Sequence, residues 1–83
     1  MKYIIQDPAQ LGRIVRETRK ALGLNQPDLA LTAGVGVRLL VEIEKGKPTA
    51  QIGKVMQVLA ALGIEIGLSL PSGIEVKSGG SNS

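Results

Sequence analysis

The residues with the clearest chemical meaning lie between positions 25 and 45, where charge is grouped on one side of a predicted helix. If that helix begins at Val37, steps of about 100° per residue place Leu40 and Ile43 on its buried side. The other side mixes charged and apolar residues, which are Arg38, Val41, Glu42 and Lys45, with Val37 at its margin. Arginine on such a side can bond guanine O6 and N7 together in the major groove. We therefore predict a helix that reads base edges in DNA.

Within this helix, Val37, Arg38, Val41 and Glu42 form the expected base-reading set. Arg38 is the principal reader, with about 1–3 kcal/mol of discrimination for a paired contact to guanine. Val37 is placed to touch a thymine methyl group. Glu42 either accepts from a cytosine amine or orients Arg38 as an i,i+4 pair, and we favour the second role. Leu39 lies near the boundary between the two sides and is expected to pack.

Phosphate contacts are expected on both flanks of this helix. Gln26 begins the preceding predicted helix, where free N–H groups and the positive end of the helix dipole favour a phosphate oxygen. On the far flank, Lys45, Lys47 and the backbone amides around Gly46 are placed to hold a second phosphate. Such contacts set the register on the duplex and carry no sequence information.

Local start and stop signals divide residues 25–45 into two short helices. Asn25 is a good N-cap, Pro27 is tolerated in the first turn, and Asp28 complements the positive end of the dipole. Gly34 stands where a left-handed residue ends a helix. Two short helices joined by a glycine turn form the helix-turn-helix motif, in which the second helix enters the major groove.

A family resemblance covers roughly residues 11–68. The chain resembles the Xre/Cro-type helix-turn-helix family in the run GLNQPDLALTAGV and, after it, IEKGKPT. More narrowly, it is similar to the HipB-like branch of antitoxins and regulators in VGVRLLVEIEKGKPTAQIGKVMQVLAALG. The resemblance implies a structural ion pair between Arg19 and Glu44, a homodimer, repression of the protein's own operon and association with a HipA-like serine/threonine kinase toxin. Family members are often polar at the positions of Val37 and Leu39, so the base-reading surface is poorer here.

Helical spacing also predicts one helix before this motif and one after it. The first begins at the N-cap Asp7, ends at Gly23 and directs inward the residues Leu11, Ile14, Val15, Thr18 and Leu22. The last has Thr49 as its N-cap, ends at Gly63 and buries Ile52, Val55, Met56, Leu59 and Leu62, with Val58 as a flank. Met56 is expected to be core filler. Every glycine is assigned to a cap, a turn or the tail.

Residues 64–70 alternate between apolar and polar or small types, which predicts a β-strand. Its apolar side consists of Ile64, Ile66, Leu68 and Leu70. A lone strand leaves its hydrogen-bonding groups unpaired, so its partner is residues 74–77 across the turn at 71–73, residues 3–5, or the same strand of a second chain. We favour the second chain, because a symmetric ribbon would place two recognition helices side by side.

Composition excludes several kinds of site. The 83 residues include no cysteine, no histidine and a single aromatic residue, Tyr3, which excludes disulfides, thiolate or imidazole metal sites and most base stacking. The net charge of +3 and the pI near 9.6 mildly favour polyanions. No phosphate-cradling loop, ligand cluster or activated nucleophile indicates an enzyme, and no cofactor is expected. No membrane-spanning run or signal peptide is recognised, so we expect a cytoplasmic protein.

Together these features predict a mainly α, lambda-repressor-like domain of about four helices, followed by a β-strand that pairs across a homodimer. Residues 1–6 form an N-terminal segment that could be a short strand, 7–63 the DNA-binding domain, 64–77 the dimerisation segment and 78–83 a flexible tail. The expected function is a DNA-binding repressor of a toxin–antitoxin operon, acting as the HipB-like antitoxin. The alternatives are a module that mainly neutralises a HipA-like kinase, and a stand-alone Xre-type regulator without a toxin.

Overall fold

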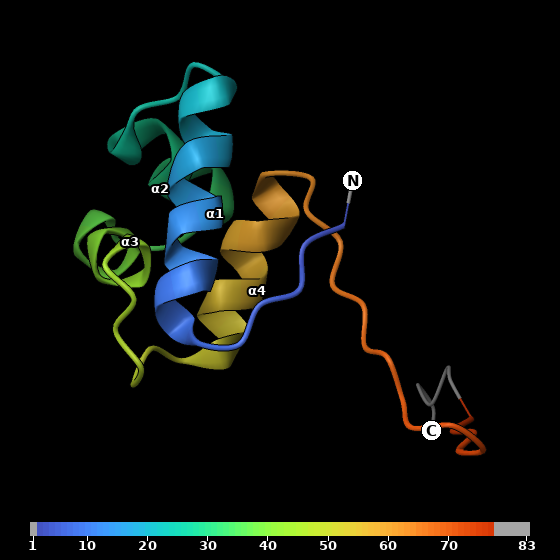
Figure 1. Ribbon diagram of the computed structural model, residues 1–83. Helices are drawn as coiled ribbons and strands as arrows, with labels where there is room; N and C mark the ends of the chain where they lie inside the picture. The colour runs from blue at the N-terminus through green and yellow to red at the C-terminus, as the bar shows by residue number, and fades with distance from the viewer. Residues whose placement is uncertain (1, 78–83) are drawn as a thin grey trace.

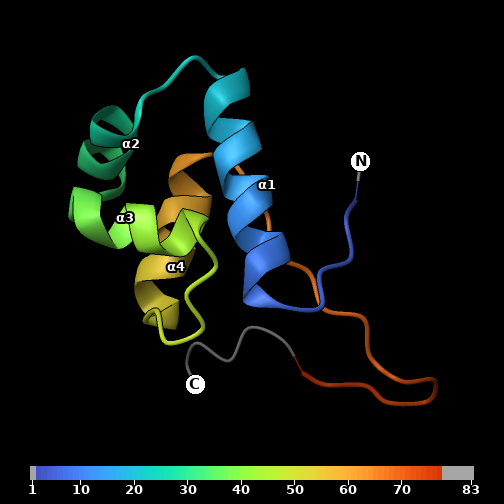
Figure 2. The same ribbon diagram turned by 60° about the vertical axis from the view of Figure 1, so that its left-hand side comes forward.

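The computed structural model describes residues 2–77 and contains four helices. They are α1 (Pro8–Ala21), α2 (Gln26–Ala33), α3 (Val37–Glu44) and α4 (Ile52–Ala61). α1 contacts α3, and α2 contacts both α3 and α4, so the helices enclose one core (Figures 1 and 2). The mainly helical, four-helix architecture agrees with the prediction.

The segment that follows α4 forms no strand within the described part of the chain. It leaves the helices as an arm and turns back near residues 71–73 (Figures 1 and 2). That turn closes with a hydrogen bond of 3.1 Å from the Ile74 N–H to the Pro71 carbonyl. Neither residues 74–77 nor residues 3–5 pair with it, so both intrachain partners are unused. The predicted tail at 78–83 lies outside the described residues.

Side-chain caps begin α1 and α2 as predicted. Asp7 Oδ1 accepts from the Gln10 N–H over 2.8 Å at the start of α1. Asn25 Oδ1 accepts from the Asp28 N–H over 2.8 Å at the start of α2. Each bond satisfies a backbone donor that the helix itself leaves unpaired, which contributes about 1 kcal/mol.

The predicted cap at Thr49 is wrong, because α4 begins three residues later at Ile52. Residues 48–50 form a turn, in which the Ala50 N–H donates to the Lys47 carbonyl over 3.4 Å. Gln51 then precedes the helix without a side-chain capping bond. A threonine favours a helix start only through its immediate neighbours. Here residues 48–50 form a turn after α3, and α4 therefore begins later, at Ile52.

All four helices end in the same backbone arrangement, which confirms the glycine ends predicted at Gly23, Gly34 and Gly63. A glycine with positive φ follows each helix, at Gly23, Gly34, Gly46 and Gly63. The glycine N–H donates to the carbonyl three residues earlier, and the next N–H donates to the carbonyl five residues earlier. At three ends that next residue is apolar and packs against the core, as Leu24, Val35 and Ile64. At the end of α3 it is Lys47, which is exposed.

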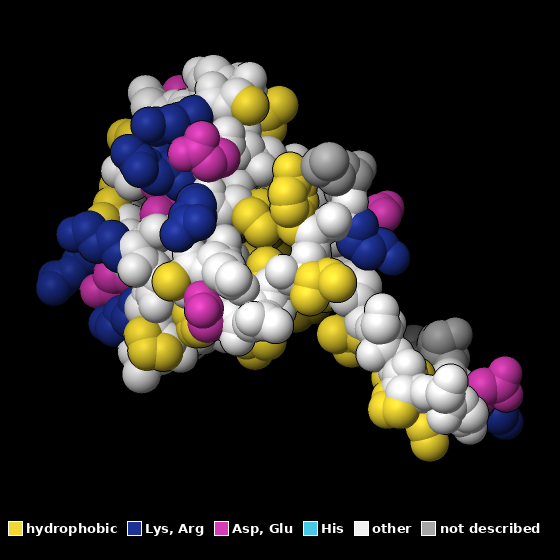
Figure 3. Space-filling view, viewed as in Figure 1, with side chains coloured by type: hydrophobic (Ala, Val, Ile, Leu, Met, Phe, Trp, Pro, Cys, Tyr) yellow, Lys and Arg dark blue, Asp and Glu magenta, His cyan; other side chains and the backbone are white. Residues whose placement is uncertain are grey.

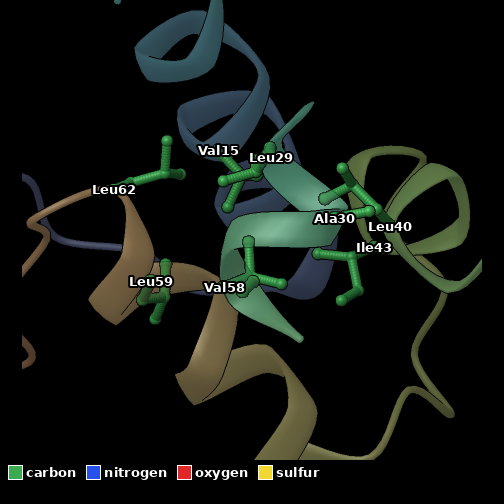
Figure 4. Packing of buried hydrophobic residues seen from close by; sticks show 9 residues of the cluster. Val15, Leu29, Ala30, Leu40, Ile43, Val58, Leu59 and Leu62 are labelled. Atoms are coloured by element: carbon green, nitrogen blue, oxygen red, sulfur yellow. The ribbon is translucent and has the colours of Figure 1, made fainter. Parts of the chain in front are cut away.

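The core lies where the four helices meet (Figure 4). Its buried apolar residues are Val15, Leu29, Ala30, Ala33, Leu40, Ile43, Val58, Leu59 and Leu62. Leu29 of α2 and Leu40 of α3 are fully buried in this core, and the two helices contact each other. Burial of one such side chain contributes about 1.5–3 kcal/mol, so the core fixes the angle between the two motif helices.

Three residues predicted to be buried are at least half exposed. Leu22 is 55% exposed because it lies beyond the last turn of α1. On α4, Ile52 is 76% and Met56 is 50% exposed, so the core-filler role of Met56 is wrong. Val58, predicted only as a flank, is fully buried. At 100° per residue, Met56 lies roughly 160° from Val58 around the helix and therefore faces outward. Ile52 lies on the same side as Leu59 but is the first residue of α4, where it remains exposed.

Gly12, in the middle of α1, is a close-packing residue, so assigning every glycine to a cap, a turn or the tail was wrong. A Cβ at Gly12 would collide with the Ile43 carbonyl oxygen and lie 2.8 Å from the Glu44 carbonyl oxygen. A Cβ at Gly46 would lie 2.6 Å from Ala9 Cα. The backbone of α1 therefore rests directly on the end of α3 and on the loop after it.

We expect Gly12→Ala to lower the free energy of unfolding by about 1–3 kcal/mol, because overpacking outweighs a gain of about 1 kcal/mol in helix propensity. Gly53→Ala is the matched control, since Gly53 is also helical but has open space around it. The control is expected to gain up to about 1 kcal/mol. Urea unfolding followed by far-UV circular dichroism measures both. Equal stability of the two variants would contradict the close contact between α1 and α3.

Candidate nucleic-acid interface

One side of α3 is buried and the other carries exposed charged residues, as the sequence predicts. Leu40 and Ile43 are buried, whereas Arg38 and Lys45 are exposed. Leu39 is half-buried and packs against the core, as expected at the boundary. The remaining members of the base-reading set are exposed or half-buried: Val37, Val41 and Glu42. Lysine and arginine side chains gather on the side of the molecule that carries α1 and α3 (Figure 3).

Glu42 pairs with Lys47 and not with Arg38, so the favoured i,i+4 role was wrong. Lys47 Nζ lies 3.3 Å from Glu42 Oε2. The backbone explains the choice, because the Lys47 N–H donates to the Glu42 carbonyl over 3.1 Å and brings the two residues together. Arg38 forms no ion pair within the described residues, so its guanidinium is available to a ligand.

Arg19 and Glu44 form a two-pronged ion pair between α1 and the last residue of α3. Arg19 Nε donates to Glu44 Oε2 over 2.7 Å, and Nη2 donates to Oε1 over 3.0 Å. Nη1 donates to the Leu24 carbonyl over 3.0 Å. The two side chains are only 10% and 4% exposed. The pair thus joins α1, the loop before α2 and the end of α3 at one point.

The carboxylate of Glu44 raises the pKa of Arg19 above its usual range. The hydrogen bonds to Glu44 are the largest cause, burial opposes them, and the opposite charge of Glu44 adds to the rise. The guanidinium therefore keeps its charge although it is buried. Because this cation is neutralised by its own partner, Arg19 is not an available phosphate ligand.

Gln26, the predicted phosphate ligand, joins this network through its side chain. Its Nε2 donates to Glu44 Oε1 over 3.1 Å, so one amide hydrogen is already used. An amide nitrogen carries two hydrogens, which leaves a second donor for a phosphate oxygen. Sequence reasoning missed this contact because residues 26 and 44 are distant in sequence and share no local pattern.

The first turn of α2 offers fewer free backbone donors than the sequence suggested. The Asp28 N–H is taken by the Asn25 cap and the Leu29 N–H by the Asn25 carbonyl. Pro27 has no N–H. The donors that remain for an anion are therefore the Gln26 N–H and the second hydrogen of its side chain.

The loop after α3 carries the cations predicted for the second phosphate. Lys45 and Lys47 are exposed, and Gly46 between them is half-buried against α1. The Gly46 N–H donates to the Ile43 carbonyl over 3.0 Å and the Lys47 N–H donates to the Glu42 carbonyl. These two amides are therefore already bonded, and the loop offers its lysine side chains instead.

The structure divides the predicted dimerisation residues into two groups. Ile64 is half-buried and packs against the core of its own chain. Ile66, Leu68 and Leu70 are exposed on the arm, with Leu68 at 86%. Exposed apolar side chains therefore remain on the arm, as they do on the outer side of α4.

None of the helices within residues 2–77 is both long enough and apolar enough to cross a bilayer. The same part of the chain contains no group of three or more acidic, cysteine or histidine side chains suited to a metal ion.

Comparison with known proteins identifies related sequences. Residues 15–68 match the family model described as Helix-turn-helix. The protein y4mF of Sinorhizobium fredii, an uncharacterised HTH-type transcriptional regulator, is 54% identical over 67 residues. The match covers 81% of this chain and 88% of y4mF.

Solved structures share the fold. A HipB-O4 20mer complex matches with a TM-score of 0.76 at 20% identity, covering 82% of this chain and 96% of HipB. HipB in a HipA-HipB-O2-O3 complex gives the same TM-score of 0.76 and 20% identity, again over 82% and 96%. The restriction-modification controller protein C.AhdI from Aeromonas hydrophila matches with a TM-score of 0.63 at 29% identity, over 70% and 88%.

Proposed function

This chain belongs to the Xre/Cro-type helix-turn-helix family, and from that premise we propose that it is a sequence-specific, DNA-binding transcriptional repressor that acts as a homodimer. The observation that carries the proposal is the exposed side of α3, where Arg38 is free of any ion pair within the described residues. Leu40 and Ile43 hold the opposite side in the core. A helix fixed in this way can present the guanidinium to the major groove without further ordering.

We assign base reading to Val37, Arg38, Val41 and Glu42. Arg38 would bond guanine O6 and N7, and Val37 would contact a thymine methyl group. The Lys47 partner of Glu42 is an exposed pair of the kind that contributes little. Glu42 can therefore exchange Lys47 for a cytosine amine, which also frees Lys47 for a phosphate.

We assign phosphate binding to two places on either side of α3. At the start of α2, Gln26 offers its backbone N–H and one side-chain hydrogen, and Glu44 orients the side chain. After α3, Lys45 and Lys47 flank Gly46 and supply charge. Contacts at both flanks would fix the depth and register of α3 in the groove.

The homodimer is proposed to form through the arm, as a symmetric antiparallel strand pair. In support, Ile66, Leu68 and Leu70 are exposed in the single chain, and Ile52 and Met56 add a second exposed apolar surface on α4. In this arrangement residues 7–63 are the DNA-binding domain and 64–77 the dimerisation segment. Two-fold symmetry then requires inverted half-sites about one helical turn apart, near 10 base pairs.

A narrower proposal is that the protein regulates its own toxin–antitoxin operon and binds a HipA-like serine/threonine kinase. Its support is the resemblance to the HipB-like branch and the fold shared with HipB, which has been solved with HipA and with operator DNA. The fold shared with the controller protein C.AhdI favours the alternative, a regulator without a toxin. Recovery of a kinase encoded beside this gene in complex with the protein would decide for the antitoxin.

We expect Arg38→Ala to reduce the preference for the DNA upstream of the protein's own gene over a random duplex by about 1–3 kcal/mol per subunit, or roughly tenfold for each 1.4 kcal/mol. Binding to the random duplex should change little. Lys45→Ala is the matched comparison, because removal of a phosphate ligand weakens both duplexes about equally. Fluorescence anisotropy at two salt concentrations, with mass by light scattering, measures these effects.

The same titrations of the wild-type protein test whether it is a repressor that prefers its own upstream DNA. A dimer that prefers its upstream DNA and binds much more weakly as salt rises supports the repressor. A well-folded protein without that preference would contradict autoregulation and would favour the partner-binding function. If Arg38→Ala weakens both duplexes equally, Arg38 contacts phosphate and the base-reading assignment fails.

A further inference from the structure

Three cations on α1 have no role in the interface described so far. Arg13, Arg16 and Lys20 are exposed and recur at steps of three and four residues, so they share one side of the helix. None of them forms an ion pair within residues 2–77. Glu17 lies on the same side as the only carboxylate. We call Arg13, Arg16 and Lys20 the α1 ridge.

The α1 ridge runs next to the end of the recognition helix. Gly12 rests on the carbonyls of Ile43 and Glu44, and Ala9 rests on Gly46, so this side of α1 lies against the loop that carries the second phosphate site. Arg16 follows Gly12 by four residues, which places it one turn further along the same side. Figure 3 shows basic side chains over both α1 and α3 on this side of the molecule.

We propose that the α1 ridge is a third phosphate-binding surface, which extends contact with DNA from the loop after α3 onto the neighbouring stretch of backbone. This inference rests on the proposed DNA-binding function. From Arg13 to Lys20 the helix rises about 10 Å, which matches about three phosphate-to-phosphate steps along one strand. Three cations along one helix can therefore follow one strand of the duplex.

The composition of the α1 ridge favours a polyanion over a protein partner. Protein interfaces are enriched in arginine, but they centre on buried apolar or aromatic anchors and are depleted in lysine. The α1 ridge contains only charged side chains. The exposed apolar residues of the chain lie elsewhere, chiefly on α4, the N-terminal segment and the arm. Arginine also matches phosphate geometry through its planar fork.

The test replaces the α1 ridge by glutamine in the full chain, as Arg13→Gln, Arg16→Gln and Lys20→Gln together. Glutamine has a helix propensity close to that of arginine and lysine, so folding should persist, and circular dichroism verifies it. The matched control is Lys2→Gln, Lys54→Gln and Lys77→Gln, which removes the same charge from other elements. Both variants and the wild type are titrated with the upstream DNA and with a random duplex over a range of salt concentrations.

The slope of log affinity against log salt concentration should become shallower by about 0.9 for each phosphate that the variant no longer neutralises, or about 2–3 per subunit for the α1 ridge. The preference for the upstream DNA should be unchanged, because phosphate binding does not read sequence. The control should keep the wild-type slope. Identical slopes for the two variants, or a changed preference in the ridge variant, would overturn the proposal.

The same data separate this inference from the proposed function. If the wild type shows no preference for its upstream DNA but the ridge variant still has the shallower slope, the α1 ridge stands and autoregulation fails. If the wild type prefers its upstream DNA and the two variants share one slope, the repressor stands and the α1 ridge fails.

Discussion

Glu44→Ala is expected to lower the free energy of unfolding by about 3–5 kcal/mol, because it leaves the guanidinium of Arg19 buried without its counter-ion. The carboxylate is 4% exposed and accepts three hydrogen bonds, two from Arg19 and one from Gln26. Small domains have only about 5–15 kcal/mol of stability, so the variant should unfold at much lower urea concentration. Circular dichroism during urea unfolding measures the change.

Glu42→Ala is the matched control for this prediction. It makes the same substitution on the same helix, but the Glu42–Lys47 pair is exposed and is held by a single hydrogen bond of 3.3 Å. Its removal should cost no more than about 1 kcal/mol. A double change, Arg19→Met with Glu44→Leu, should recover part of the stability because no buried charge remains. Equal effects of Glu44→Ala and Glu42→Ala would show that burial of the Arg19–Glu44 pair does not govern stability.

Leu68→Asp is expected to convert the dimer to a monomer and to weaken binding to the upstream DNA by about 10²–10⁴-fold, because the DNA no longer gains from binding two linked half-sites at once. Leu68 is 86% exposed in the single chain, so aspartate there should leave the four-helix fold intact. In the proposed ribbon it would instead bury a charge on the Ile/Leu side. Light scattering measures the mass and anisotropy measures the affinity.

Ser69→Asp provides the control at the adjacent position. It adds the same charge, but alternation along a strand directs residue 69 to the opposite side from residue 68. It should keep the dimer and most of the affinity. A Leu68→Asp protein that remains dimeric, or a Ser69→Asp protein that dissociates equally, would contradict pairing of the arm through its Ile/Leu side.

Local signals in the sequence predicted the elements that position the interface. The caps at Asp7 and Asn25 and the left-handed Gly34 were identified because each acts within a few residues of itself. The two-sided pattern of α3 was identified because Leu40 and Ile43 recur at helical spacing. Both kinds of signal depend only on residues that are close together in the sequence, so a single sequence is enough to recognise them.

Local patterns did not reveal the contacts that form when the elements pack together, and only the family resemblance indicated the Arg19–Glu44 pair. Glycine is unfavourable inside a helix, and the reason for Gly12 becomes clear only from the carbonyl oxygens of α3 that lie against it. The bond from Gln26 to Glu44 and the pairing of Glu42 with Lys47 depend on how α2 and the loop return towards α3. Such geometry is set by packing of the whole domain, and no short motif encodes it.

Periodicity also failed to distinguish which apolar residues of α4 face their own core. Ile52 and Met56 repeat at the same helical steps as Leu59, yet only Leu59 is buried. A helix that meets its own core on one side and a second chain on another would show a wide apolar stripe of this kind. The pattern indicates that apolar residues share one side of a helix. It does not indicate whether the chain's own core or another chain covers that side.

At the end of α3, the charge of the chain can vary without a change in its fold. The other three helix ends are anchored by the apolar residues Leu24, Val35 and Ile64, whose replacement would remove buried surface. At the end of α3 the anchor is the backbone contact between Gly46 and Ala9, and the side chain of Lys47 remains in solvent. The charge of this loop can therefore change, and with it the proposed binding of phosphate, while positions 9 and 46 preserve the architecture.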